Sequence, residues 1–215
     1  MPFLITLEGI EGSGKTTQLL RLQEHLQNCG HQVAVTREPG GCRIADAIRT
    51  LLLDPDNDSI VPQAELLLYS AARAQHVAEF ILPALEQGKI VVCDRFADAT
   101  TVYQGVGRGL DMAQIEAVNR FASEGLTPDL TLLLDYPVEE GLQRARMRNQ
   151  SINLESEGRF ELESLTFHRR IRQGYLDLAA REKRFRVIDA IGHEDAIAER
   201  VLAAVDLFLA SRRSA

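Results

Sequence analysis

The feature that most constrains the fold is a glycine-rich segment directly after the first apolar run of the chain. It reads Gly9-Ile10-Glu11-Gly12-Ser13-Gly14-Lys15-Thr16 and satisfies the pattern GxxxxGKS/T between an expected strand and an expected helix. Glycines let the backbone wrap closely around a phosphate with its N–H groups pointing inward, and the following helix adds its N-terminal dipole. A plain glycine-rich turn is the alternative, but it leaves the flanking strand and helix unexplained. The segment therefore predicts a site for a nucleoside triphosphate.

Two side chains of this loop are expected to act on the phosphates directly. Lys15 supplies a positive charge between the β- and γ-phosphates, and the Thr16 hydroxyl can ligate Mg²⁺. The expected triphosphate-binding residues are Gly9, Ile10, Glu11, Gly12, Ser13, Gly14, Lys15, Thr16 and Thr17. The sequence contains no Asn-Lys-x-Asp segment that would read guanine, which disfavours a GTPase. The loop does not by itself decide the reaction.

Apolar runs of strand length alternate with longer helical patterns along the chain. The predicted strands are 3–7, 32–36, 90–93, 130–134 and 185–188. The predicted helices are 15–28, 43–53, 64–87, 112–123, 138–147, 161–181 and 194–209. This order is typical of an α/β protein with a parallel, doubly wound sheet, in which ligands bind at the carboxyl ends of the strands.

The composition agrees with one globular domain. At about 150 residues per domain, 215 residues favour a single domain over 1–215 that carries insertions. Contents of 45% hydrophobic and 26% charged residues exclude a disordered chain. The net charge of -7 disfavours a partner such as nucleic acid or an acidic membrane, although a local pocket can still bind a phosphorylated ligand.

The chain shows no sign of membrane insertion or secretion. No apolar run approaches the ~18 residues that span a bilayer, and the N-terminus lacks the pattern of a signal peptide. Cys29, Cys42 and Cys93 are too widely spaced for a CxxC metal site or a disulfide framework, so we interpret them as reduced. We therefore expect a cytoplasmic protein.

Polar residues follow the second and third predicted strands. Asp94 and Arg95 come directly after the strand 90–93, at the sheet edge that should carry the loop. Asp94 can hold Mg²⁺ through water and Arg95 can bind phosphate oxygens with two N–H groups, with a strand-end ion pair as the alternative. The segment 36–41 reads TREPGG, and a turn explains its Pro and Gly but not Arg37 and Glu38.

Tyr69 and Arg73 lie four residues apart on a predicted helix and therefore share a face. An aromatic ring beside a guanidinium can stack on a base while the arginine hydrogen-bonds to the edge of that base. A core aromatic next to a surface arginine is the alternative interpretation.

Together these motifs resemble the bacterial thymidylate kinase family, within the P-loop nucleoside monophosphate kinases. The residues that carry the resemblance are 9–17, 36–41, 71–73, 94–95, 103–105, 128–130 and 158–161. It covers essentially the whole chain and implies a P-loop NTPase fold, with a five-stranded parallel sheet flanked by helices and a lid segment. It also implies transfer of the γ-phosphoryl group of ATP to dTMP, giving dTDP and ADP in dTTP synthesis, with Mg²⁺ as cofactor. A homodimer is implied as well, with 64–87 and 112–123 as candidate contacts.

The resemblance implies roles for individual residues of the acceptor site. Tyr69 would stack on thymine, Arg73 would read its O4, and Thr100 would meet its N3 edge. Tyr103 would exclude a ribose 2′-hydroxyl. The full expected dTMP-binding set is Glu11, Arg37, Glu38, Pro39, Tyr69, Arg73, Arg95, Thr100, Tyr103 and Gln104.

Two of these residues are also expected near the phosphates. Arg95 would bridge the donor and acceptor phosphates, and Glu11 would lie near the acceptor and the metal. The sequence departs from residues common in the family at Cys42-Arg43, Ala45 and Ala99. These departures affect individual hydrogen bonds rather than the family assignment.

Positive charge is concentrated in the segment 144–186, which has 11 basic and 6 acidic residues. Arginines flank a polar loop there, so we expect a lid over about 146–160 that closes over ATP. The glycine-rich loop has Ser13 and no arginine, so the resemblance implies the type of thymidylate kinase whose assisting arginine lies in the lid. Arg148 and Arg159 are the favoured catalytic arginines and Arg146 is the next, beside Lys15 and Arg95. A solvated helix face is the alternative for each lid arginine.

Two other functions remain open at this stage. The first is a kinase for another nucleoside or nucleotide, because only Tyr69, Arg73, Thr100 and Tyr103 argue for thymine. The second is a regulator that uses a nucleoside triphosphate only as a switch. Lys15 and the lid arginines argue against a switch, because a passive binder does not need cations clustered on a transferring phosphate.

Overall fold

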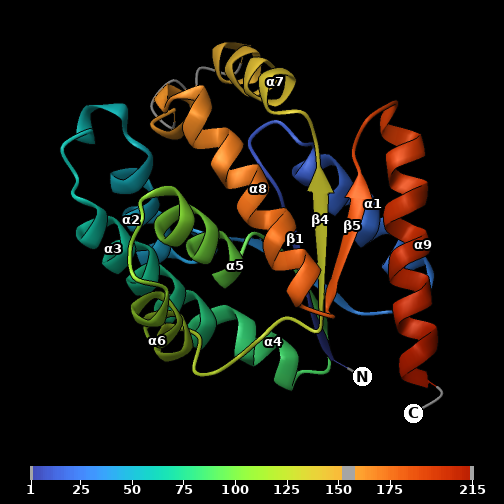
Figure 1. The fold of residues 1–215 in the computed structure, drawn as a ribbon. Helices are drawn as coiled ribbons and strands as arrows, with labels where there is room; N and C mark the ends of the chain where they lie inside the picture. The colour runs from blue at the N-terminus through green and yellow to red at the C-terminus, as the bar shows by residue number, and fades with distance from the viewer. Residues whose placement is uncertain (1, 152–157, 214–215) are drawn as a thin grey trace.

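Strand β1 (Phe3–Glu8) lies at the centre of the sheet in the computed structural model, which describes residues 2–151 and 158–213. Its neighbours are β3 (Ile90–Asp94) and β4 (Leu130–Asp135), while β2 (Val33–Arg37) and β5 (Phe185–Asp189) form the edges. The order is β2-β3-β1-β4-β5 and every pairing is parallel, so all carboxyl ends meet at one edge. Figure 1 shows β4 and β5 side by side with their arrowheads pointing the same way. The predicted five-stranded parallel α/β sheet is confirmed.

Helical segments connect the strands. The helices are α1 (Lys15–Asn28), α2 (Arg43–Leu53), α3 (Pro62–His76), α4 (Leu82–Glu86), α5 (Ala97–Thr100), α6 (Met112–Ala122), α7 (Val138–Ser151), α8 (Leu165–Arg181) and α9 (Glu194–Arg213). The 3₁₀ turns η1 (Pro55–Asn57) and η5 (Phe160–Leu162) and the π-helical turns η2 (Val77–Ile81) and η3 (Thr101–Gly107) lie between them. None of the helices in the described part of the chain is long and apolar enough to cross a bilayer.

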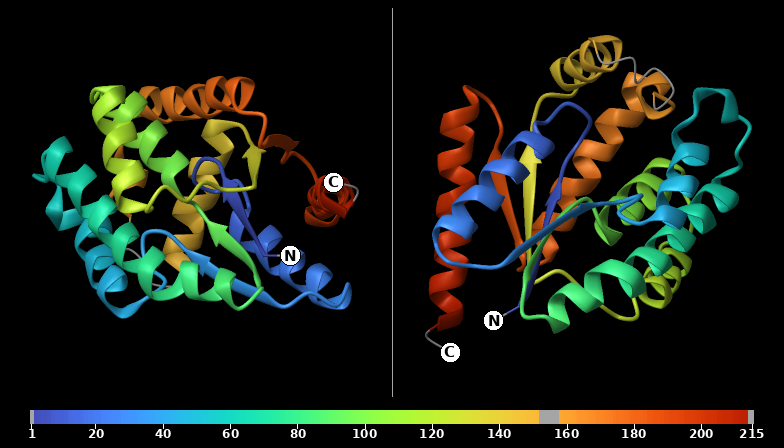
Figure 2. Two further views of the ribbon diagram at one scale, coloured as in Figure 1. Left: turned by 90° about the horizontal axis from the view of Figure 1, so that it is seen from below. Right: turned by 180° about the vertical axis from the view of Figure 1, so that it is seen from behind.

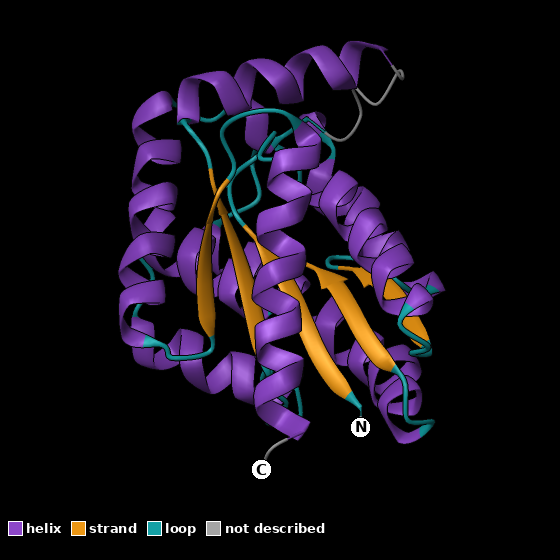
Figure 3. Cartoon of the chain, turned by 90° about the vertical axis from the view of Figure 1, so that its right-hand side faces the viewer, coloured by secondary structure: helices purple, strands orange, loops and turns teal. Residues whose placement is uncertain are grey.

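Both faces of the sheet are covered because strand side chains alternate between them. Phe3, Ile5 and Leu7 of β1 pack against α1 and α9 on one face. Leu4 points to the other face, where it packs with η2 and α4. Figure 2 shows α1 and α9 on one side of the sheet and the remaining helices on the other or above its carboxyl edge. In Figure 3 the helix that ends at the C-terminus, α9, crosses in front of the strands. Ligands of such sheets bind at the carboxyl edge, which is where a site is expected here.

The helix predicted over 64–87 contains a π-helical turn. It begins as α3, widens into η2 and continues as α4. The N–H of Leu82 donates to the carbonyl of Val77, five residues earlier, and Pro83 has no N–H to donate. The widened turn thus accommodates a proline inside the helical segment.

Some predicted boundaries were wrong near the site. Residues 97–107 are helical although no helix was predicted, because threonines and glycines lower helix propensity there while Val102 and Tyr103 pack into the core. Helix α7 continues to Ser151, although the predicted helix ended at residue 147. Helix α8 begins at Leu165 rather than at Glu161, and Ser164 caps it by accepting a hydrogen bond from the Phe167 N–H.

Candidate active site

A cavity of about 1000 Å³ lies at the carboxyl edge of the sheet, and this volume is large enough for small-molecule ligands. The predicted site residues that line it are Glu11, Gly12, Gly14, Lys15, Thr16, Thr17, Arg37, Glu38, Pro39, Tyr69, Arg73, Asp94, Arg95, Thr100, Tyr103, Gln104 and Arg148. Gly9, Ile10 and Ser13 belong to the loop but do not line the cavity. The fold therefore brings most of the predicted set to one place.

The loop between β1 and α1 has the backbone conformation that its glycines allow. Gly9 and Gly12 have φ angles of 139° and 71°, and a Cβ on Gly12 would clash with the carbonyl oxygen of Gly141. The Lys15 Nζ donates to the carbonyls of Gly9 at 3.0 Å and Ile10 at 2.8 Å. Burial, followed by the charge of Arg95, lowers the pKa of Lys15 to about 8. An anion bound in the loop would stabilise the ammonium form.

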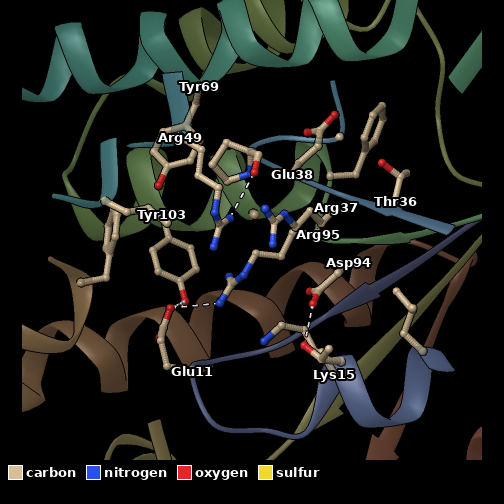
Figure 4. A pocket seen from close by; sticks show the side chains of 18 of the residues that line it. Glu11, Lys15, Thr36, Arg37, Glu38, Arg49, Tyr69, Asp94, Arg95 and Tyr103 are labelled. Carbon is tan, nitrogen blue, oxygen red and sulfur yellow. Dashed lines mark hydrogen bonds and ion pairs between the residues drawn. The ribbon is translucent and has the colours of Figure 1, made fainter. Parts of the chain in front are cut away.

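The start of α1 and the end of β3 place two oxygen ligands together. The Thr16 hydroxyl donates to Asp94 Oδ2 at 3.3 Å, and both residues line the cavity beside Lys15 (Figure 4). A hydroxyl and a carboxylate are hard oxygen donors that suit Mg²⁺, which keeps several of its waters. The described residues contain no group of three or more His, Cys, Asp or Glu side chains that could hold a metal without other ligands. The Thr16 hydroxyl and the Asp94 carboxylate suit a Mg²⁺ ion whose other ligands include phosphate oxygens.

Arg95 and Glu11 form the central ion pair of the cavity. Arg95 Nη2 donates to Glu11 Oε1 at 3.0 Å, and the Tyr103 hydroxyl donates to the same oxygen at 2.5 Å. His168 Nδ1 lies 3.3 Å from the other carboxylate oxygen. Burial by itself would raise the pKa of Glu11, but Arg95, His168 and Lys15 together hold it well below its usual range. Glu11 is therefore an anion that fixes the position of Arg95.

Arg73 lines the cavity and belongs to a buried hydrogen-bond network. Its Nε donates to Glu38 Oε2 at 2.8 Å, and its Nη2 donates to the hydroxyl of Thr100 at 3.0 Å. His76 joins the network, with Nδ1 3.1 Å from Glu38 and Nε2 2.6 Å from the Thr36 hydroxyl. Glu38 of the TREPGG turn thus orients Arg73, a relationship that a turn-only interpretation does not explain.

Aromatic rings surround this part of the cavity. Tyr69, Tyr103 and Phe160 form an aromatic cluster, with ring centroids 6.3 Å apart for Tyr69 and Phe160 and 5.5 Å for Tyr103 and Phe160. Gln104 Nε2 donates to the buried Glu65 carboxylate at 2.9 Å. That bond fixes the amide so that its oxygen remains available as an acceptor. The cluster and the polar groups beside it suit a planar base with hydrogen-bonding edges.

Comparisons with known proteins agree with this geometry. The sequence pattern of the family "Thymidylate kinase" matches residues 7–201. A thymidylate kinase from Syntrophotalea carbinolica is 59% identical over 202 residues, which cover 94% of each chain. One from Geobacter sulfurreducens is 54% identical over 210 residues, or 97% of each chain. The chain belongs to the thymidylate kinase family.

The fold comparison supports the same assignment. The crystal structure of thymidylate kinase from Ehrlichia chaffeensis is 32% identical in sequence and has a TM-score of 0.74. The match covers 95% of this chain and 98% of that one. Thymidylate kinases are transferases that phosphorylate dTMP to dTDP with ATP. The predicted family and enzyme class are confirmed.

The expected lid arginines of this kinase occupy different environments. Arg148 on α7 lines the cavity, whereas the guanidinium of Arg146 donates to the carbonyl of Glu161. Arg159 is buried, with Nη2 2.8 Å from a carboxylate oxygen of Glu65, and it does not line the cavity. Residues 152–157 of the expected lid lie outside the described part of the chain.

Sequence reasoning missed several residues of the thymidylate kinase site. Arg49 lines the cavity, and so does Arg144, which the sequence placed only among the arginines before the lid loop. Figure 4 shows the side chains of Arg37, Arg49 and Arg95 converging between Tyr69 and Lys15. Arg49 follows Asp46, which also lines the cavity, by three positions on α2, but no motif marks either residue, so helical spacing alone could not identify Arg49. The sequence also gave no indication of three buried residues, His76, Glu65 and Tyr175, because their hydrogen-bond partners are distant in the sequence. Among the described residues, Arg49 and Arg144 add two guanidinium groups to the lining of the cavity, and Asp46 and Glu161 add two carboxylates.

Proposed function

We propose that this kinase transfers the γ-phosphoryl group of ATP, bound at the glycine-rich loop, to dTMP bound beside the aromatic cluster. The reaction gives dTDP and ADP and is a step of dTTP synthesis. The observation that carries this proposal is the position of Arg95, which lines one cavity together with Lys15 on the loop side and Tyr103 on the aromatic side. An arginine at that position can contact donor and acceptor phosphates together.

Phosphoryl transfer needs alignment and neutralisation of charge more than it needs covalent chemistry. Lys15 and the loop N–H groups would bind the β- and γ-phosphates, while Arg37 and Arg49 would hold the phosphate of dTMP. Arg95 would bridge the two groups, since its guanidinium is already oriented by Glu11 at 3.0 Å. Closure of the α7 side would bring Arg148 onto the transferring group and exclude water.

Mg²⁺ would be held by Thr16 and, through water, by Asp94, and it would neutralise phosphate charge during transfer. The adjacency of this hydroxyl and carboxylate, 3.3 Å apart, supports the assignment. Thr16→Ala should raise the Mg²⁺ concentration needed for half-maximal activity. A lower activity with an unchanged Mg²⁺ requirement would contradict the metal role.

Thymine would be recognised by three kinds of contact. Tyr69 would stack on the ring, Arg73 would donate to O4, and Thr100 and Gln104 would meet the N3 edge. Tyr103 would lie against the sugar at C2′ and exclude ribonucleotides. The buried network that fixes Arg73 and Gln104 supports these roles, because it presents both groups with their orientations set.

Substrate profiling tests the proposal against its main alternative, a kinase for another nucleotide. Purified protein is assayed with ATP, Mg²⁺ and dTMP, dUMP, dCMP or AMP, and the diphosphate product is measured. We expect dTMP to give the highest kcat/KM. A preference for dCMP or AMP would overturn the assignment of the acceptor, and no diphosphate from any acceptor would favour a regulatory nucleotide switch.

The protein would act as a homodimer in the cytoplasm. Exposed apolar side chains on neighbouring helices support a dimer contact, with Leu67 of α3 60% exposed and Phe121 of α6 85% exposed. Its three free cysteines and its use of ATP are consistent with a reducing, ATP-rich compartment. Phe121→Asp should shift the protein to a monomer in analytical ultracentrifugation. Leu207→Asp, which alters an exposed leucine of α9, is the matched control.

A further inference from the structure

Tyr175 of α8 places its hydroxyl beside Arg95, although no sequence motif assigns it a role. The hydroxyl accepts a hydrogen bond from Arg95 Nη1 at 3.3 Å and donates to Glu8 Oε2 at 2.7 Å. The side chain is 1% exposed and does not line the cavity, so it does not touch a bound substrate. Any effect of this hydroxyl on the reaction must therefore pass through Arg95 or Glu8.

The side-chain carboxyl group of Glu8 binds both the Tyr175 hydroxyl and the backbone next to Arg95. It is the last residue of β1 and is completely buried. Its Oε1 accepts a hydrogen bond from the Phe96 N–H at 2.8 Å, while Oε2 accepts the one from Tyr175. The peptide that follows Arg95 and the tyrosine that holds its guanidinium are thus attached to the same group.

Both the backbone and the guanidinium of Arg95 are bound by neighbouring groups. Its φ angle of 69° is unusual for a residue other than glycine, and its N–H donates to the carbonyl of Leu7 at 2.9 Å. Its guanidinium lies over the Tyr103 ring at 4.9 Å, with Nη2 on Glu11 and Nη1 on Tyr175. A free arginine side chain samples many rotamers, and two anchored nitrogens restrict the planar group to one orientation.

We propose that Tyr175 is a positioning residue that fixes Arg95 for phosphoryl transfer, and that Glu8 fixes the Tyr175 hydroxyl. The proposal rests on the role proposed above for Arg95. Glu11 binds one terminal nitrogen of the Arg95 guanidinium and Tyr175 binds the other. Loss of either hydrogen bond would therefore let the guanidinium rotate about the hydrogen bond that remains. The arrangement also links α8, the helix that follows the expected lid, to the residue that contacts both substrates.

The first experiment removes only the hydroxyl. In Tyr175→Phe the ring still packs against Tyr103, 6.3 Å away, and the core is preserved. We expect kcat to fall by about tenfold or more while the KM for dTMP changes by less than about threefold. An unchanged kcat would overturn the proposal. Thermal unfolding is measured in parallel to show that the variant is folded.

Tyr136→Phe is the matched control. Tyr136 is 2% exposed, its hydroxyl donates to Glu140 at 3.0 Å, and it does not line the cavity. The variant therefore also removes one buried tyrosine hydroxyl bonded to a glutamate. Its kcat should equal that of the wild type. An equal loss of kcat in both variants would show a general effect of removing buried hydroxyls and would overturn the proposal.

A double-mutant cycle separates positioning from a merely structural role. If Tyr175 acts through Arg95, Tyr175→Phe should change kcat/KM by less than about twofold in an Arg95→Ala background. The same loss in both backgrounds would overturn the inference and leave the role of Arg95 intact. A fully active Arg95→Ala enzyme would instead overturn the proposed role of Arg95, and the inference with it.

Glu8→Gln tests the second half of the proposal. The Phe96 N–H donates to Oε1 and the Tyr175 hydroxyl to Oε2, and a glutamine has an oxygen at only one of these two positions, so in the same arrangement it can accept only one of the two hydrogen bonds. We expect a loss of kcat that does not add to that of Tyr175→Phe. Additive losses would overturn the role of Glu8 and leave that of Tyr175 standing.

Discussion

Arg159 forms a buried ion pair with Glu65 of α3, with Arg159 Nη2 2.8 Å from the carboxylate. The Arg159 side chain is 7% exposed and Glu65 is completely buried. The backbone N–H of Arg159 also donates to the carbonyl of Leu53 at 3.2 Å. Arg159 thus binds the segment before α8 to α2 and α3. Arg148, in contrast, lines the cavity. The two favoured lid arginines should therefore respond differently to substitution.

Replacement of Arg159 should affect stability. Arg159→Ala leaves the buried Glu65 carboxylate with fewer partners, and we expect the free energy of unfolding to fall by about 1–3 kcal/mol. The exposed Arg148 is the comparison, since Arg148→Ala should change that free energy by less than about 0.5 kcal/mol. Urea unfolding of both variants measures the difference. Equal stabilities would contradict a structural contribution of the Glu65 pair.

Replacement of Arg148 should affect catalysis. An arginine that meets the transferring phosphoryl group stabilises its charge, so Arg148→Ala should lower kcat by at least about tenfold, or roughly 1.4 kcal/mol. The KM for dTMP should change little. Arg159→Ala and Arg146→Ala in the same assay rank the three lid arginines, and Arg181→Ala, on an exposed position of α8, serves as the control. If Arg148→Ala and Arg159→Ala both keep the wild-type kcat, the lid assignment is wrong.

The environment of Glu65 also predicts a pH dependence of stability. Burial alone would raise its pKa, but hydrogen bonds from Arg108 and Gln104 and the charge of Arg159 hold the pKa below its ordinary value of 4.5. Below about pH 5 the unfolded chain takes up a proton at this position that the folded chain excludes, so the free energy of unfolding falls. Wild type should therefore lose more stability than Glu65→Gln between about pH 6 and about pH 4.

Urea unfolding at several pH values tests this difference. Glu199→Gln, which alters an exposed carboxylate of α9, is the control and should follow the wild type. Parallel pH dependences for wild type and Glu65→Gln would contradict the expectation.

The sequence predicts those parts of the site in which neighbours along the chain act together. The glycine-rich loop was predictable because its spacing and its flanking strand and helix all lie within 3–28. Asp94 and Arg95 were predictable because parallel strands end at a common edge. The environment of Arg159 was not, because its partner Glu65 comes from a different part of the chain. The helical form of 97–107 was not predictable either, since core packing outweighs low helix propensity there.

Lys15 should be essential for transfer but not for folding. In Lys15→Ala the loop keeps its glycines and backbone donors while the positive charge at the β- and γ-phosphates is lost, so we expect almost complete loss of dTDP formation. Circular dichroism and thermal unfolding should remain close to those of the wild type. Wild-type turnover by a folded Lys15→Ala protein would falsify the role of the loop.

Arg73 should control the affinity for dTMP. Four of its five N–H groups are already used, by Glu38, Asn119, Thr100 and the carbonyl of Phe96, so one Nη1 hydrogen remains for a ligand. Arg73→Ala should raise the KM for dTMP by about tenfold or more, because a single buried hydrogen bond contributes about 1–3 kcal/mol. The KM for ATP should stay the same, as the loop is unaffected.

Arg73→Ala also removes a hydrogen-bond partner of the buried Glu38. The free energy of unfolding of the variant is therefore measured together with its KM for dTMP. Arg73→Lys retains a charge near Glu38 but lacks the planar fork, and it should raise the KM for dTMP with a smaller loss of stability than Arg73→Ala. Arg120→Ala, on an exposed position of α6, controls for the loss of an arginine in general. An unchanged KM for dTMP in a folded Arg73→Ala protein would exclude a base-reading role, because the variant lacks the guanidinium that this role requires.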